Sequence, residues 1–191
     1  MAEHPAGISR ELLDGAVAIA DALNQHRLPY ALIGGLAAGY RTHARFTRDV
    51  DFLLTVPQLT LPPLLDELAR RGFEFDQLTA IREWTQHHMT VLTYRGVRID
   101  WLKPVIPVYQ HVLDRATEEQ WLSYPVRVAS AEGLILLKLL ADRTQDHLDI
   151  ENLVAAYEDK LDLDWIKAEW QAIAPLDDPR MVRLLALVQR R

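Results

Sequence analysis

The apolar positions in the first half of the chain switch between helical and extended spacing. After Ser9, a good N-cap, apolar residues recur every three or four positions to near Gln25, which predicts an amphipathic helix. Residues 30–33 form a short apolar run that two glycines stop, which predicts a buried strand and a tight turn into a helix over residues 36–40. The chain thus begins with a helix, a strand, a Gly-Gly turn and a second helix.

Turn residues divide the next part of the chain into short elements. Gly72 closes an amphipathic helix, and Arg95-Gly96 suits a two-residue turn between the arms of a hairpin. The pattern predicts strands at residues 50–55, 73–75, 88–94, 97–102 and 126–128, and helices at residues 64–71 and 108–116.

From Ser130 onward the pattern is wholly helical. Ser130 caps a helix rich in Leu and Ile, and further helices are expected near residues 145–157, near 164–173 and from 179 to the end. We therefore expect an α/β fold. A mixed β-sheet with flanking helices would occupy residues 1–128, and a small helical region at residues 129–191 would pack on it.

Composition narrows the class of protein. A chain of 191 residues, 49% of them hydrophobic, can bury one sizeable core. The formal net charge of −6 argues against a protein that coats nucleic acid. The absence of cysteine excludes disulfides and thiolate metal sites, and the amino terminus does not resemble a signal segment. The longest apolar run is too short to cross a bilayer, so we expect a cytoplasmic protein with no membrane insertion.

Three aspartates carry the most informative pattern. Asp49 and Asp51 flank one residue of a predicted strand, so both project from the same face, about 7 Å apart at their Cα atoms. Mutually repelling acids on an apolar strand suit Mg²⁺ with its waters and a substrate phosphate. Asp100 also lies inside an apolar strand; beside the first, it would complete a site for two ions roughly 3.5–4 Å apart, as in-line phosphoryl transfer requires. The alternatives are that Asp49 and Asp51 are ordinary surface acids at a strand end, and that Asp100 only helps to form a turn.

Gly34 and Gly35 supply a second feature. A glycine pair at the end of a strand lets backbone N–H groups approach phosphate, helped by the positive end of the following helix. Their spacing matches neither the dinucleotide-binding nor the Walker A motif, so those two nucleotide folds are disfavoured.

Together, the Gly-Gly turn, the Asp-Val-Asp strand and the later Ile-Asp-Trp segment resemble the nucleotidyltransferase superfamily related to DNA polymerase β. The resemblance covers the chain from about Tyr30 to Trp101. It implies a mixed-sheet nucleotidyltransferase fold, a nucleoside triphosphate substrate such as ATP, Mg²⁺ as the cofactor, and catalysis by the three aspartates. Gly35 stands where many members have Ser, which leaves phosphate binding to backbone contacts.

The helical half is similar to small bacterial members, including nucleotidyltransferase toxins of toxin–antitoxin and abortive-infection systems; antibiotic nucleotidyltransferases share the amino-terminal motif. The resemblance implies that Lys138 reaches the triphosphate and that Arg143 or Asp146 lies near the nucleotide or acceptor. Lys138 could instead extend from a mostly buried helix towards solvent. Four charged residues could equally form a network of ion pairs at helix ends: Asp142, Arg143, Asp146 and Asp149.

The remaining polar residues can each be interpreted in two ways. Arg41, Arg45 and Arg48 could bind phosphate or an acidic acceptor, or belong to a solvated loop. His147 could be a general base or an exposed helix histidine.

The expected reaction is Mg²⁺-dependent transfer of a nucleotide to an acceptor hydroxyl, with Asp100 deprotonating that hydroxyl. The acceptor stays open among a tRNA, a protein and a small molecule such as an antibiotic, and a toxin would have an antitoxin partner. The alternative is a catalytically silent nucleotide-binding or partner-binding module of the same fold. The three mutually repelling acids favour the enzyme.

Overall fold

The computed structural model describes residues 8–42, 47–121 and 123–189. Helices and strands alternate up to β7, and helices follow. The α-helices are α1 (Arg10–Gln25), α2 (Gly34–Arg41), α3 (Leu61–Arg70), α4 (Gln77–Gln86), α5 (Pro107–Asp114), α6 (Ala131–Ala141), α7 (Thr144–Tyr157), α8 (Leu163–Gln171) and α9 (Pro179–Gln189), with a 3₁₀ turn at Glu158–Lys160. The strands are β1 (Tyr30–Ile33), β2 (Asp49–Leu54), β3 (Phe73–Glu74), β4 (Met89–Tyr94), β5 (Val97–Leu102), β6 (Thr117–Trp121) and β7 (Tyr124–Val128).

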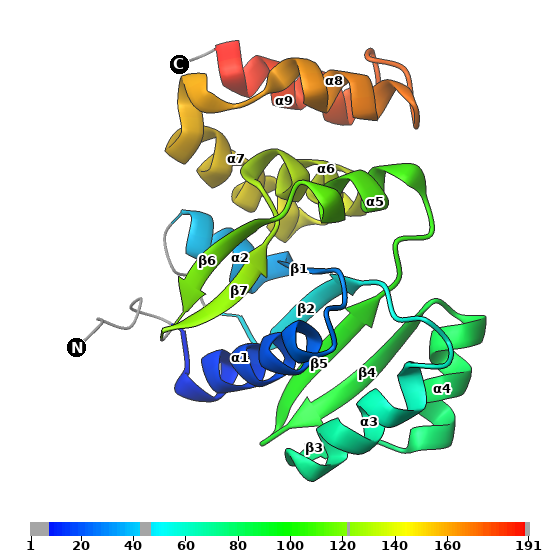
Figure 1. Cartoon of the computed structure of the whole chain (residues 1–191). Coiled ribbons are helices and arrows are strands. Elements are labelled where there is room, and N and C mark those ends of the chain that lie inside the picture. The colour runs from blue at the N-terminus through cyan, green and yellow to red at the C-terminus, as the bar shows by residue number, and fades with distance from the viewer. Residues whose placement is uncertain (1–7, 43–46, 122, 190–191) are drawn as a thin grey trace.

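The strands of the described residues form one mixed seven-stranded sheet in the order β3-β4-β5-β2-β1-β7-β6 (Figure 1). Two neighbouring pairs are parallel, β2 with β5 and β1 with β7, and the others are antiparallel. The central strands are almost entirely buried because helices cover them. The α/β fold expected from the sequence is confirmed.

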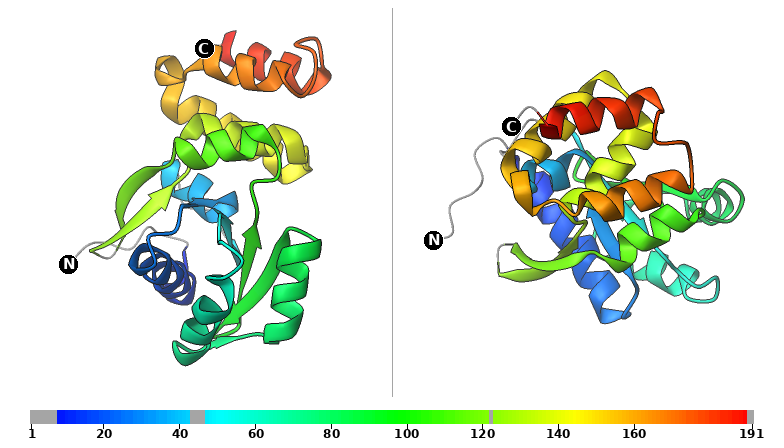
Figure 2. Two further views of the ribbon diagram at one scale, coloured as in Figure 1. Left: turned by 45° about the vertical axis from the view of Figure 1, so that its right-hand side comes forward. Right: turned by 90° about the horizontal axis from the view of Figure 1, so that it is seen from above.

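Helices pack on both faces of this sheet. On one face α1 lies over β5, where Gly15 faces Ile99, and α4 sets Trp84 edge-on against Trp101, with ring centroids 6.0 Å apart. On the other side α2 and α5 contact β1 and β2, and α6 packs against both helices. The last helices stack outward from α6, as the two views of Figure 2 show. The cleft between the sheet and α6 is therefore bounded by residues far apart in sequence.

Local signals explain where several helices begin. The side chains of Ser9, Asp76, Ser130 and Asp162 each accept a hydrogen bond from a backbone N–H in the first turn of α1, α4, α6 and α8, respectively. By contrast, no side chain caps α2, which starts directly at Gly34. The first N–H groups of α2 are thus not occupied by an N-cap side chain.

The sequence pattern located most elements within a few residues of their bounds, but it missed α4 and β6. The structure shows why β6 was missed: its side chains are mostly exposed, so it lacks an apolar signal. The division at residues 128 and 129 stays a prediction. Within the described residues, no helix is long and apolar enough to cross a membrane.

Candidate active site

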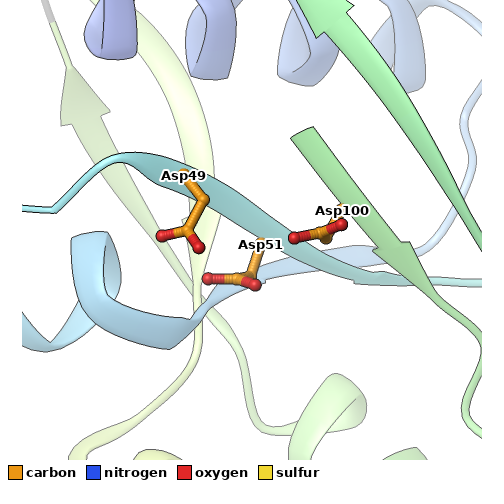
Figure 3. Close-up of side chains that lie close together, drawn as sticks. All are labelled: Asp49, Asp51 and Asp100. Carbon is orange, nitrogen blue, oxygen red and sulfur yellow. The ribbon is translucent and has the colours of Figure 1, made fainter. Parts of the chain in front are cut away.

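Three carboxylates converge where β2 and β5 run side by side. Asp49 and Asp51 point from the same face of β2, and the parallel register places Asp51 opposite Asp100. One carboxylate oxygen from each residue lies within 4.8 Å of the others (Figure 3). The predicted convergence of the three acids is thus present in the fold.

Burial and mutual repulsion act on the carboxylates of this cluster. Burial, and then the nearby charges of Asp49 and Asp100, raise the pKa of Asp51 from 3.8 to about 7. Thr47 donates a hydrogen bond of 3.0 Å to Asp49, and Arg98 Nη2 lies 2.7 Å from Oδ1 of Asp100 as an ion pair. Carboxylate oxygens that repel one another at this spacing fit a divalent cation such as Mg²⁺.

Gly34 is required by the position of Asp51. Its φ of +70° lies in the left-handed region, and a Cβ built on it would come within 2.6 Å of Asp51 Cγ and closer still to Oδ2. The Asp51 carboxylate therefore rests directly against the backbone at the start of α2. Any side chain at this position would push the carboxylate out of the cluster.

A cavity of about 680 Å³ opens in front of these residues. Its polar wall combines the start of α2 with Asp49 and Asp51, and with side chains of α6 and the α6–α7 turn. Its apolar wall consists of Ile33, Leu53, Leu102, Tyr109, Leu134, Leu137 and Ala141. The sequence predicted most of the charged residues but not this apolar wall, because its members come from five separate elements.

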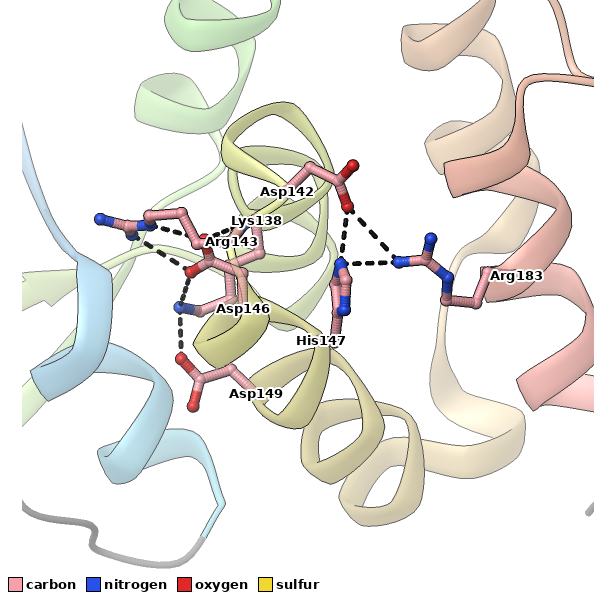
Figure 4. Close-up of polar contacts among 7 residues, drawn as sticks. All are labelled: Lys138, Asp142, Arg143, Asp146, His147, Asp149 and Arg183. Carbon is pink, nitrogen blue, oxygen red and sulfur yellow. Dashed lines mark hydrogen bonds and ion pairs between the residues drawn. The ribbon is translucent and has the colours of Figure 1, made fainter.

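The charged residues of the helical half form a buried network at one side of the cavity (Figure 4). Lys138 Nζ lies 2.5 Å from Asp149 Oδ2 and 3.2 Å from Asp146 Oδ1. Arg143 Nε lies 2.7 Å from Asp146 Oδ2, and this contact lowers the pKa of Asp146 against the opposing effect of burial. Lys138, Arg143 and Asp146 line the cavity. The ion-pair alternative is therefore present in the structure, whereas the contact of these residues with a triphosphate stays a prediction. Lys138 is buried and does not extend to solvent.

Of the other polar residues singled out from the sequence, His147 and Arg41 lie away from the cavity. His147 contacts Asp142 at 2.7 Å and Arg183 at 2.6 Å, between α7 and α9, and does not line the cavity. Arg41 donates to the backbone of Ala129 and pairs with a glutamate of β6, so it joins α2 to the sheet. Arg48 lines the cavity, and Arg45 lies outside the described residues.

Sequence reasoning missed Arg98 as a member of the site. It lies opposite Asp49 in the register, and its guanidinium contacts both oxygens of Asp100. The sequence did contain a signal for Arg98, because residues two apart on a strand, such as Arg98 and Asp100, share a face.

Comparison with known proteins identifies the family of this chain. Residues 13–186 match a family described as "nucleotidyl transferase of unknown function (DUF2204)". The chain belongs to this nucleotidyl transferase family. It is thus an enzyme. The chain has no match among curated proteins.

Solved structures share the fold of this nucleotidyl transferase. An antigenic nucleotidyltransferase-like protein from Paracoccidioides brasiliensis has a TM-score of 0.55 and 18% identity, covering 96% of this chain and 89% of its own. The lincosamide antibiotic adenylyltransferase LnuA, in its lincomycin-bound structure, has a TM-score of 0.54 and 18% identity, covering 78% and 99%. The antibiotic-resistance factor ANT(2'')-Ia has a TM-score of 0.53 and 15% identity, covering 93% and 94%. At these identities the likeness establishes the fold.

Proposed function

We propose that this nucleotidyl transferase uses Mg²⁺ to transfer a nucleoside monophosphate from a nucleoside triphosphate to an acceptor hydroxyl. One observation carries the proposal: three carboxylates from two parallel strands meet beside the uncapped start of α2, at a cavity large enough for a nucleotide. Metal ligands and phosphate-binding backbone are thereby brought together. ATP is the first triphosphate to test.

Asp49, Asp51 and Asp100 would hold Mg²⁺, two ions by the usual arrangement, and the bound metal would supply charge neutralisation at the transferring phosphoryl group. Asp100 accepts the proton of the acceptor hydroxyl. The acceptor oxygen then bonds to the α-phosphorus as the bond from that phosphorus to the bridging oxygen breaks, and pyrophosphate leaves. Catalysis rests on positioning and charge, without a covalent enzyme intermediate.

The triphosphate would bind between α2 and the helical half. Gly34 and Gly35 line the cavity, so their backbone N–H groups would bind phosphate, and the Arg143 side chain, 73% exposed, can extend to phosphate oxygens. Lys138 lies deeper and is 5% exposed, so it would contribute a positive field and a contact at the cavity wall. Asp146 would orient Arg143 and Lys138 towards the phosphates.

The apolar wall suits the nucleobase. A triphosphate nucleotide has one charged end and one flat, weakly polar end, and the cavity is lined by both charged and apolar side chains. Tyr109 and Leu137 lie on this wall.

A small hydroxyl compound is the favoured acceptor. Three cations that act on the carboxylates are each paired with an acid: Lys138, Arg143 and Arg98. A tRNA would have to compete with these internal carboxylates, and the net charge of −6 opposes a polyanion. A protein acceptor, as for a toxin with an antitoxin partner, is the second arm of the test.

Titration calorimetry with the four nucleoside triphosphates, with and without Mg²⁺, tests the site. Native protein should bind in a metal-dependent manner, and Asp51→Asn should lose this binding. Glu74→Gln, an exposed acid on β3, is the matched control and should bind like the native protein. Folded native protein that binds no triphosphate would refute the proposal.

A transfer assay then identifies the acceptor. Protein with α-labelled triphosphate is incubated separately with total tRNA, with cell protein and with pools of hydroxyl compounds. Label should appear in the small-molecule arm and disappear in Asp100→Asn, whose folding is checked by its melting temperature. Label in tRNA or protein instead would replace the favoured acceptor class while keeping the reaction.

A further inference from the structure

Arg98 holds both oxygens of Asp100. Its Nε donates to Oδ2 at 2.9 Å, and its Nη2 lies 2.7 Å from Oδ1. Both residues project from the same face of β5, and the register places Arg98 directly opposite Asp49. The guanidinium is thus the cation nearest to the carboxylate cluster on the β5 side.

The charge of Arg98 acts on the whole cluster. Its pKa is raised by the hydrogen bond to Asp100 and, in addition, by the charges of Asp100, Asp49 and Asp51. Lys138 and Arg143 also act on Asp51 from the opposite side of the cavity, but both are paired with Asp146. Arg98 instead directs its guanidinium at a member of the cluster itself.

In this arrangement Asp100 is shielded from the cavity. The residue is 9% exposed and does not line the cavity, although Asp49 and Asp51 do. The Arg98 side chain is 56% exposed, so it is the partner that can move without disturbing the core. For Asp100 to bind a metal ion or contact an acceptor hydroxyl, the Arg98 guanidinium has to lose at least part of its contact with Asp100.

We propose that Arg98 is the built-in counter-cation of the carboxylate cluster, and that a divalent cation competes with it for Asp100. This inference rests on the metal site of the proposed function. Two cations on one carboxylate repel each other, so the guanidinium opposes loading of the bare ion. A triphosphate, which brings its own negative charges, removes that opposition. Arg98 therefore makes the enzyme select a metal–nucleotide complex over free metal.

Mn²⁺ binding without nucleotide, followed by the electron paramagnetic resonance signal of the free ion, tests the competition. Arg98→Met should bind Mn²⁺ about fivefold or more tightly than the native protein, because one competing charge is gone. The matched control is Arg95→Met, which removes the same charge from the turn of the same hairpin, where Arg95 pairs with Asp14 instead. It should bind Mn²⁺ like the native protein.

Two results would overturn the inference. Weaker binding in Arg98→Met, parallel to the loss in Asp100→Asn, would mean that Arg98 only positions Asp100 for the metal. Unchanged binding would reduce Arg98 to a surface ion pair.

A second readout separates this inference from the proposed function. In the presence of a chelator, Arg98→Met should melt at a lower temperature than Arg95→Met and the native protein, because the three carboxylates lose their counter-cation. If no protein binds Mn²⁺, the metal site fails. The melting comparison then decides the counter-cation role alone, and equal melting temperatures refute it.

Discussion

The carboxylate of Asp51 rests against the backbone of Gly34, so closely that no side chain fits at residue 34. This contact joins the strand that carries two of the acids to the turn that would bind phosphate. The relative position of the proposed metal ligand and the proposed phosphate site therefore depends on the absence of a side chain at Gly34.

Gly34→Ala should abolish Mn²⁺ binding and nucleotidyl transfer, because the added Cβ displaces Asp51. The positive φ adds a strain of about 1–2 kcal/mol, since an L-residue is disfavoured in the left-handed region. Gly72→Ala is the control for that strain. Gly72 also has a positive φ, of +90°, but a Cβ there meets nothing within 4 Å.

Denaturation and Mn²⁺ titration of both variants decide the matter. Both should lose a similar amount of stability, whereas metal binding should be lost only in Gly34→Ala. Equal metal affinity in the two variants would show that Asp51 can move without leaving the cluster.

Asp51→Asn should stabilise the metal-free protein at neutral and alkaline pH. The pKa of Asp51 is raised to about 7 in the folded state, against an ordinary value of 3.8. The unfolded carboxyl ionises first, so the free energy of unfolding of the native protein falls as pH rises from about 4 to 7 and is then level. The gain in the variant should be absent near pH 4 and largest above pH 7, at most about 4 kcal/mol, since one pKa unit corresponds to about 1.4 kcal/mol.

Urea denaturation of both proteins with a chelator, at pH 4, 6 and 8, measures this difference. Adding Mg²⁺ at pH 8 should reverse the order of stability, because the ion binds the folded native protein and not the variant. A variant less stable than the native protein at pH 8 without metal would contradict the raised pKa.

Lys138→Met should destabilise the fold by about 3 kcal/mol or more, because it removes a buried cation that pairs with two buried carboxylates. Lys138, Asp146 and Asp149 are all nearly inaccessible, and Arg143 also pairs with Asp146. The double variant Lys138→Met/Asp149→Asn should recover part of the loss, since it also removes a buried negative charge.

Urea denaturation of the single and double variants tests this, with Lys167→Met as the control. Lys167 forms an exposed ion pair with Asp164, which should contribute little. A single variant as stable as the control would show that the buried acids find other partners.

Much of the local structure could be read directly from the chain. The N-cap side chains of Ser9 and Ser130 mark helix starts where the structure has them, and apolar spacing located β1, β2 and β5. The exposed strand β6 and the helix α4 were missed, because neither has a strong apolar pattern of its own. Their positions depend on packing against neighbours.

The candidate site, too, was predictable from the sequence only in part. The sequence by itself determined the chemistry: the strand period places Asp49 and Asp51 on one face, and the glycine pair leaves backbone free at the start of a helix. Only the tertiary structure decided that β5 lies parallel to β2 in a register that brings Asp100 to the pair, and that Arg98 covers it. The tertiary structure also placed the buried charge network of α6 and α7 at the cavity wall. The physical reason is that side-chain direction follows from local backbone geometry, whereas strand order and helix packing minimise the exposed apolar area of the whole chain.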